Sequence, residues 1–223
     1  MRICAKLALL CFLLGISLTV SWAQTTKPSK TPVPSILNNP PDDKPQYFPK
    51  GIFRDTSDKS AFKDFVARWY SSDLRAMHEP SLFETSSKDT SLVAYRFLWL
   101  RTFDNPVAIR ISIRPDGTAS LTGKITNGAG GYNPGVVTWD KSFELSASQV
   151  SMFLELLKKA EFWTLPTEVS SFGVDGAQWI MEGVRNGTYH VVDRFSPQKD
   201  DYTNLCFFLV NLSKIRLKAK EIY

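Results

Sequence analysis

The side chains best suited to chemistry gather in one stretch of the chain, residues 173–197, GVDGAQWIMEGVRNGTYHVVDRFSP. Near its middle, the dipeptide Asn186-Gly187 predicts a tight hairpin, because both central residues of a type I′ turn need a positive φ. Two carboxylates of this hairpin, Glu182 and Asp193, could form the acid/base pair that glycoside-hydrolysing enzymes use, with the pKa of one raised by its neighbour.

The register of the hairpin decides which of its side chains can meet. A two-residue turn places Trp179 opposite Arg194 and makes Glu182 and Asp193 diagonal neighbours, about 7–8 Å apart at the backbone. One face then carries both carboxylates, and the other carries Trp179, His190 and Arg194. Both faces mix polar and apolar residues, so the pattern leaves open which one is buried.

A salt-bridged sheet face is the alternative to a catalytic carboxylate pair. Arg96, Arg101 or Arg110 on a neighbouring strand could supply the cation. We favour this alternative, because structural ion pairs also gather carboxylates and perturb their pKa values. For Trp179 and Arg194, a cation–π contact across the hairpin is the simplest interpretation.

Other chemistries have less support in the sequence. His190 paired with Asp175 or Asp193 could serve as general base to a serine, but the chain lacks a G-x-S-x-G elbow. Asp175 with Asp193 and Glu182 could hold Ca²⁺, but the pattern of a calcium-binding loop is missing. The two histidines do not have metal-ligand spacing, and we expect neither a metal nor a cofactor.

The remaining candidates are binding residues rather than catalytic ones. In the hairpin these are Asp175, Trp179 and Arg194. Outside it lies Tyr132, at the tip of the Gly-rich segment 128–135, GAGGYNPG. This segment lacks the Lys-Ser/Thr of a phosphate loop, so we interpret it as a flexible connection or a lid.

The sequence pattern around these residues predicts an α+β fold, with a mostly antiparallel sheet of about six strands and three helices. Alternating apolar residues and short turns, such as Asp116-Gly117, favour an antiparallel meander of four strands after the first helix. Ser146 and Gln149 form a capping-box pattern at the start of the second helix. The polar stretch before residue 90 shows no regular pattern, and we expect the helices to pack on one side of the sheet. The expected helices cover about 60–77, 147–160 and 201–220, and the expected strands cover about 91–103, 107–114, 119–125, 137–145, 177–185 and 188–195.

The N-terminus has the pattern of a secretory signal peptide over residues 1–23. A basic start precedes the apolar run Leu7 to Val20, which is short for a membrane span, and Ser21-Trp22-Ala23 places small residues before a cleavage site. An uncleaved anchor is the alternative. Residues 24–50 contain seven prolines among polar residues, which favours a disordered tether to a single domain over residues 51–223.

Charge and cysteine content argue against a nucleic-acid-binding protein and against a disulfide-stabilised domain. The formal net charge of +5 is mild and forms no basic block, which argues against nucleic-acid binding. Once Cys4 and Cys11 leave with the signal, only Cys206 remains, so the exported domain has no internal disulfide and depends on burial. We expect a monomer, without a transmembrane segment in the mature chain, and Cys206 on the inner face of the last helix.

The run DGAQWIMEG followed by YHVVDRFSP resembles a family of uncharacterised exported bacterial proteins. The similarity covers roughly Tyr95 to Ile215 and is most specific from Asp175 to Pro197. It implies export and a bacterial source, in the periplasm or the extracellular medium, and it implies no activity. We therefore expect a non-enzymatic domain of the cell envelope that binds an envelope protein or a small ligand. The alternative is a hydrolase, acting on carbohydrate, that uses Glu182 and Asp193.

Overall fold

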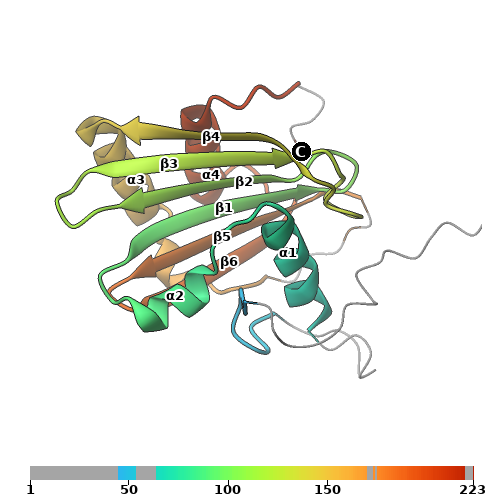
Figure 1. Ribbon diagram of the computed structural model, residues 1–223, viewed down its shortest axis with the longest axis horizontal. Coiled ribbons are helices and arrows are strands. Elements are labelled where there is room, and N and C mark those ends of the chain that lie inside the picture. The colour runs from blue at the N-terminus through green and yellow to red at the C-terminus, as the bar shows by residue number, and fades with distance from the viewer. Residues whose placement is uncertain (1–44, 54–63, 170–172, 174, 219–222) are drawn as a thin grey trace, which may run out of the picture. The chain divides into compact units, whose positions relative to one another are not determined.

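The computed structural model describes residues 45–53, 64–169, 173, 175–218 and 223, and these form an α+β fold around one antiparallel sheet (Figure 1). In chain order its elements are α1 (Phe65–Ala76), α2 (Leu82–Lys88), β1 (Val93–Arg101), β2 (Val107–Ile113), β3 (Ala119–Thr126), β4 (Val137–Leu145), α3 (Ala147–Lys159), the 3₁₀ turn η3 (Phe162–Thr164), β5 (Ala177–Arg185), β6 (Thr188–Phe195) and α4 (Asp201–Ser213).

The sheet has six strands in the order β4-β3-β2-β1-β5-β6, and every neighbouring pair is antiparallel. The predicted meander of four strands is therefore confirmed, and the late hairpin adds to it beside β1. This makes β1 a central strand, with β2 on one side and β5 on the other. All its residues except the first, Val93, are buried.

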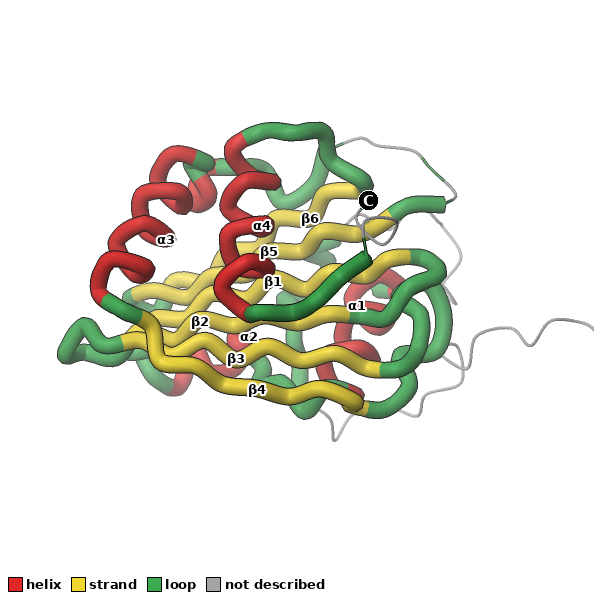
Figure 2. Tube along the Cα trace, turned by 90° about the horizontal axis from the view of Figure 1, so that it is seen from above, coloured by secondary structure: helices red, strands yellow, loops and turns green. Residues whose placement is uncertain are grey.

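Helices cover both faces of the sheet, so the expectation of one covered side is wrong (Figure 2). Tyr95, Phe97 and Trp99 of β1 pack in one cluster with residues of α3 and α4. Leu98 and Leu100, which point the other way, pack with residues of α1 and of the segment 45–53. A strand that is apolar on both faces needs cover on both, because side chains alternate along it.

The structure contains a helix that the sequence reasoning missed. The stretch interpreted as a polar loop before residue 90 holds α2, where the Ser81 hydroxyl accepts a hydrogen bond from the Glu84 amide at 3.0 Å. Ser81 and Glu84 have the S-x-x-E spacing of a capping box, which was the available signal. The described part of the chain thus holds four α-helices rather than three.

One predicted helix end also needs correction, and one lies outside the described residues. The helix expected over 201–220 stops at Ser213, because Lys214 adopts a left-handed conformation with φ 59°. The described part of the first helix starts at Phe65, and its predicted start at residue 60 lies outside the described residues. The buried centre of α1 is formed by Tyr70 and Leu74, whereas Val66 and Trp69 are partly buried.

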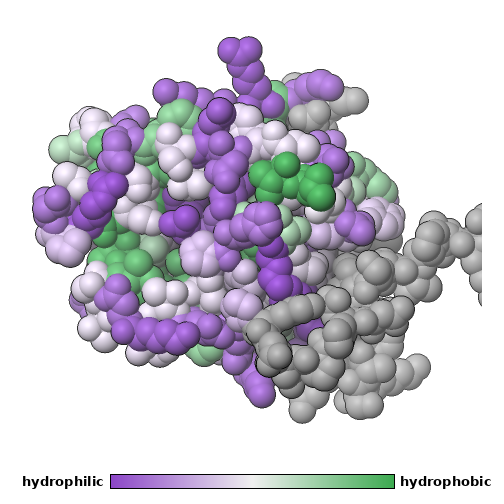
Figure 3. All heavy atoms as spheres, in the orientation of Figure 1, coloured by the Kyte–Doolittle hydropathy of each residue, from purple (hydrophilic) through white to green (hydrophobic). Residues whose placement is uncertain are grey.

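The folded domain also extends further towards the N-terminus than residue 51, where we placed its boundary. Tyr47 and Phe48, assigned to the tether, are each 3% exposed and pack against Tyr70 and Leu98 in the second core cluster. In Figure 3, the described atoms on the face with α1 and α2 are mainly polar or intermediate in hydropathy, and the apolar ones form separate spots.

Candidate functional site

The β5–β6 hairpin has the predicted turn and register. Asn186 and Gly187 have φ values of 52° and 71°, and Trp179 faces Arg194 across the ladder. Both faces of the hairpin are buried, which settles the point that the sequence left open. Glu182 and Asp193 face the side of α1 and α2, and Trp179 faces the side of α3 and α4.

Glu182 is the carboxylate end of a buried ion pair. Nε and Nη2 of Arg96 donate to Oε2 of Glu182 at 2.8 and 2.6 Å, and the Tyr189 hydroxyl donates to Oε1 at 2.9 Å. Neither partner of the ion pair is exposed, with 0% of each side chain accessible. Burial raises the pKa of Glu182, although Arg96 and Tyr189 act in the opposite direction. The salt-bridged interpretation with Arg96 is therefore confirmed.

This ion pair continues into a cluster that joins several elements. Glu79, in the connection between α1 and α2, forms ion pairs with Arg110 at 2.9 Å, Lys124 at 3.1 Å and Arg96 at 3.5 Å. Burial alone would raise the pKa of Glu79, but the three cations together lower it below its usual value. The arrangement covers the face of β2 that carries Arg110. The sequence analysis missed Glu79. Its position marks only the end of a helix, and its three cationic partners lie on strands that are distant in the chain.

Asp193 has a different environment from Glu182. Its Oδ2 accepts a hydrogen bond from the Tyr70 hydroxyl at 2.7 Å, and its Oδ1 has no partner in the described structure. Burial raises the pKa of Asp193 to about 7. An acid/base pair must reach its substrate directly or through one water. Glu182 and Asp193 are instead 0% and 7% exposed, and each is held by its own partners.

Trp179 and Arg194 face each other in register but do not form the predicted cation–π contact. The Trp179 ring packs on Trp99 and Phe207, with centroid distances of 4.9 Å each, and is 3% exposed. The Arg194 guanidinium lies 5.8 Å from the Tyr202 ring centroid and donates to the carbonyl oxygens of residues 166 and 167. Trp179 and Arg194 therefore both pack against α4, and Arg194 also holds the loop before β5.

His190 is not placed for the general-base role. Its ring packs edge-on against Phe162 at 5.1 Å, on the face opposite to Asp193, and burial lowers the pKa of His190. Asp175, the other suggested partner, is exposed at the mouth of the hairpin. Among the described residues, no group of three or more His, Cys, Asp or Glu side chains is placed to hold a metal ion.

Tyr132 lies on a segment that is anchored to the body of the fold. The amide of Gly130 donates to Asp104 O at 3.1 Å, and Nε1 of Trp69 donates to Gly130 O at 2.7 Å. A Cβ on Gly130 would approach the backbone of residue 101 within 2.6 Å, so only glycine fits there. The Tyr132 ring, 47% exposed, lies beside Phe103, with 6.3 Å between their centroids. These contacts contradict the interpretation of this segment as a flexible connection.

A pocket of about 460 Å³ lies beside the turn of the hairpin, and sequence reasoning missed it. Its wall is mainly apolar, with Leu154 and Leu157 from α3 and Phe162 and Trp163 from η3. Its other lining residues are polar or charged: Lys158, Glu161, Thr164 and Arg185. No local pattern could reveal it, because the end of β5 meets the end of α3 only in the folded chain.

No protein-family model matches the chain, and no curated protein matches its sequence. The resemblance to exported bacterial proteins therefore stays a prediction. Within the described ranges, no helix has the length and apolar character needed to cross a membrane.

Proposed function

We propose that this protein is an exported, non-catalytic binding domain of the cell envelope, and that the pocket beside the hairpin turn is its ligand site. The observation that carries this proposal is the pocket itself. Its volume of about 460 Å³ lies within the range of about 300–1,000 Å³ that small-molecule sites occupy. Aromatic and aliphatic side chains form most of its wall, as in most such sites.

The placement of the carboxylates supports binding over hydrolysis. A hydrolase would need Glu182 and Asp193 at a surface that water and substrate can reach. Both are buried, and neither lines the pocket. The ion pair with Arg96 joins Glu182 of β5 to β1, and the hydrogen bond from Tyr70 joins Asp193 of β6 to α1.

A neutral apolar fluorophore, N-phenylnaphthylamine, tests the binding site. We expect saturable binding to the mature protein, and a loss of about tenfold in affinity in Leu154→Gln, because this variant places an amide in the apolar wall. Met152→Gln is the matched control, since Met152 is an exposed apolar residue of α3 outside the pocket. Absence of saturable binding, or equal losses in the two variants, would contradict the proposed site.

Export is tested separately from binding. The signal-like N-terminus supports a mature chain that starts at Gln24, after the small residues of Ser21-Trp22-Ala23. Expression of the full chain in a bacterial host, followed by cell fractionation and intact-mass measurement, should show this mature form outside the cytoplasm. A full-length chain that stays in the cytoplasm would refute export.

A further inference from the structure

Two cationic side chains lie at the rim of the pocket. Lys158 belongs to the last turn of α3, and Arg185 is the last residue of β5. Both line the pocket and are exposed. Among the described residues, neither forms an ion pair within 4 Å, although the adjacent Lys159 pairs with Asp201 at 2.9 Å.

Arg185 is held in place by the apolar wall rather than by a carboxylate. Its guanidinium lies 5.2 Å from the centroid of the Trp163 ring, in cation–π geometry. A guanidinium held over a ring keeps its forked N–H donors available for a carboxylate or a similar planar anion. The pocket therefore combines an aromatic wall with an oriented cation at its edge.

The charge balance of the rim limits the kind of anion that fits. Glu161 is the acidic residue of the pocket lining, and it stands near Lys158 in the chain. Two cations and one carboxylate leave a surplus of one positive charge among the lining residues. This balance favours a group with a single negative charge over a polyanion, which the carboxylate of Glu161 would repel.

From this arrangement, and resting on the proposed function of the same pocket, we infer that the ligand is an amphiphilic organic anion. Its apolar body would lie against Leu157, Phe162 and Trp163. Its single anionic group, a carboxylate or a chemical equivalent, would lie between Lys158 and Arg185.

A pair of fluorophores that differ by one charge tests this inference. Anilinonaphthalene sulfonate has the same aromatic skeleton as N-phenylnaphthylamine and adds one sulfonate. We expect the mature protein to bind the sulfonate about fivefold more tightly than the amine, since each partly exposed charge contact contributes modestly. This preference should decline as salt is added, because salt screens exposed charges.

Variants then locate the anionic contact. In the double variant Lys158→Gln/Arg185→Gln the preference for the sulfonate over the amine should vanish, so that the ratio of the two affinities falls to about one. Lys159→Gln removes a neighbouring lysine that pairs with Asp201 outside the pocket, and it should leave the preference intact. The single variant Lys158→Gln serves if loss of the Arg185–Trp163 contact disturbs folding, and it should halve the preference or more.

The outcomes separate the two proposals. If the amine does not bind saturably, the proposed function of the pocket fails. If the amine binds and the sulfonate binds no more tightly, or if the preference survives in the double variant, the pocket stands and the inference about its anionic ligand is overturned.

Discussion

Glu182 and Asp193 show how neighbouring carboxylates in one hairpin can have different electrostatic environments. Glu182 receives two donors from Arg96 and one from Tyr189. Asp193 receives one donor, from Tyr70, and keeps an oxygen without a partner in the described structure. A buried charge is destabilising unless it is paired and hydrogen-bonded, so the charged form of Asp193 is stabilised less than that of Glu182.

We predict that Asp193→Asn flattens the dependence of stability on pH. The pKa of Asp193 is about 7 in the folded protein, against about 3.9 in an unfolded chain. Between these values the unfolded chain releases the proton and the native protein keeps it, so stability falls as pH rises, by up to about 1.4 kcal/mol per pH unit. Above pH 7 the contribution is constant.

Urea unfolding of both proteins from pH 4 to 8 measures this effect. The variant should gain relative stability as pH rises, since Asn keeps an acceptor for the Tyr70 hydroxyl without a charge. Asp73 is fully buried and also has a raised pKa. It therefore leaves a residual dependence of stability on pH in both the wild type and the variant. Parallel curves for the two proteins would show that Asp193 does not titrate in this range.

Trp179→Ala should destabilise the fold by about 3–5 kcal/mol, as loss of a buried aromatic residue does. The ring packs on Phe97, Trp99 and Phe207, and the cavity would open at the centre of the larger core cluster. Denaturant unfolding measures the difference. Unchanged stability with loss of a binding activity would instead identify Trp179 as an exposed ligand platform.

At the scale of the elements, α2 depends on a single capping residue that also connects two segments. The Ser81 hydroxyl accepts from the Glu84 amide at 3.0 Å and donates to Gln46 O at 2.6 Å. Ser81→Ala removes both contacts and should reduce the free energy of unfolding by about 1–2 kcal/mol. Ser87→Ala in the same helix removes only an exposed hydrogen bond to Glu84 O and should have a smaller effect. Equal effects of the two changes would contradict the role of the cap.

The orientation of α4 can be tested by thiol chemistry. Cys206 is fully buried on the inner face of this helix, as the sequence predicted, and burial raises the pKa of its thiol well above the usual value. Reaction with a thiol reagent requires the exposed thiolate, so labelling of the native protein should be slow and should accelerate in denaturant. Rapid labelling under native conditions would show that another face of α4 packs on the sheet.

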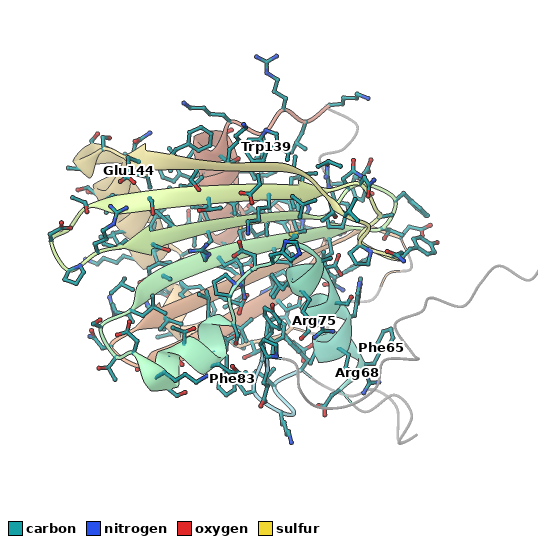
Figure 4. All side chains as sticks on the ribbon, viewed as in Figure 1. Phe65, Arg68, Arg75, Phe83, Trp139 and Glu144 are labelled. Carbon is teal, nitrogen blue, oxygen red and sulfur yellow. The ribbon has the colours of Figure 1, made fainter. Side chains whose placement is uncertain are left out.

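At the scale of the whole molecule, Glu79 connects the α1–α2 side to three strands of the sheet. Glu79→Gln leaves buried Arg96 and Lys124 with less counter-charge and should destabilise the protein by about 3–5 kcal/mol. Glu144→Gln is the control: Glu144 lies on the edge strand β4, and the variant breaks its exposed pair with Arg114, so the loss of stability should be far smaller than in Glu79→Gln (Figure 4). Chemical unfolding at pH 7 compares the two, and a small loss in Glu79→Gln would show that the cluster does not hold the layers together.

The parts of the fold that follow from neighbours in the chain could be predicted from the sequence. The turn at Asn186-Gly187 set the register of the hairpin, and Ser146 with Gln149 capped α3 as expected. These features depend on a few adjacent residues, whose backbone preferences are local. The unbroken run of bulky residues in β1 was a local signal for burial on both faces, although we expected helices on one side of the sheet alone.

The site could not be predicted in this way, because its members meet only after folding. The sequence by itself determined that Glu182 and Asp193 share a face and offered three arginines as partners, but the tertiary structure decided that Arg96 pairs with Glu182 and that Tyr70 donates to Asp193. Likewise the pocket exists because the end of α3 packs beside Arg185 at the hairpin turn. Burial and charge pairing depend on contacts between distant segments, and no local pattern encodes those contacts.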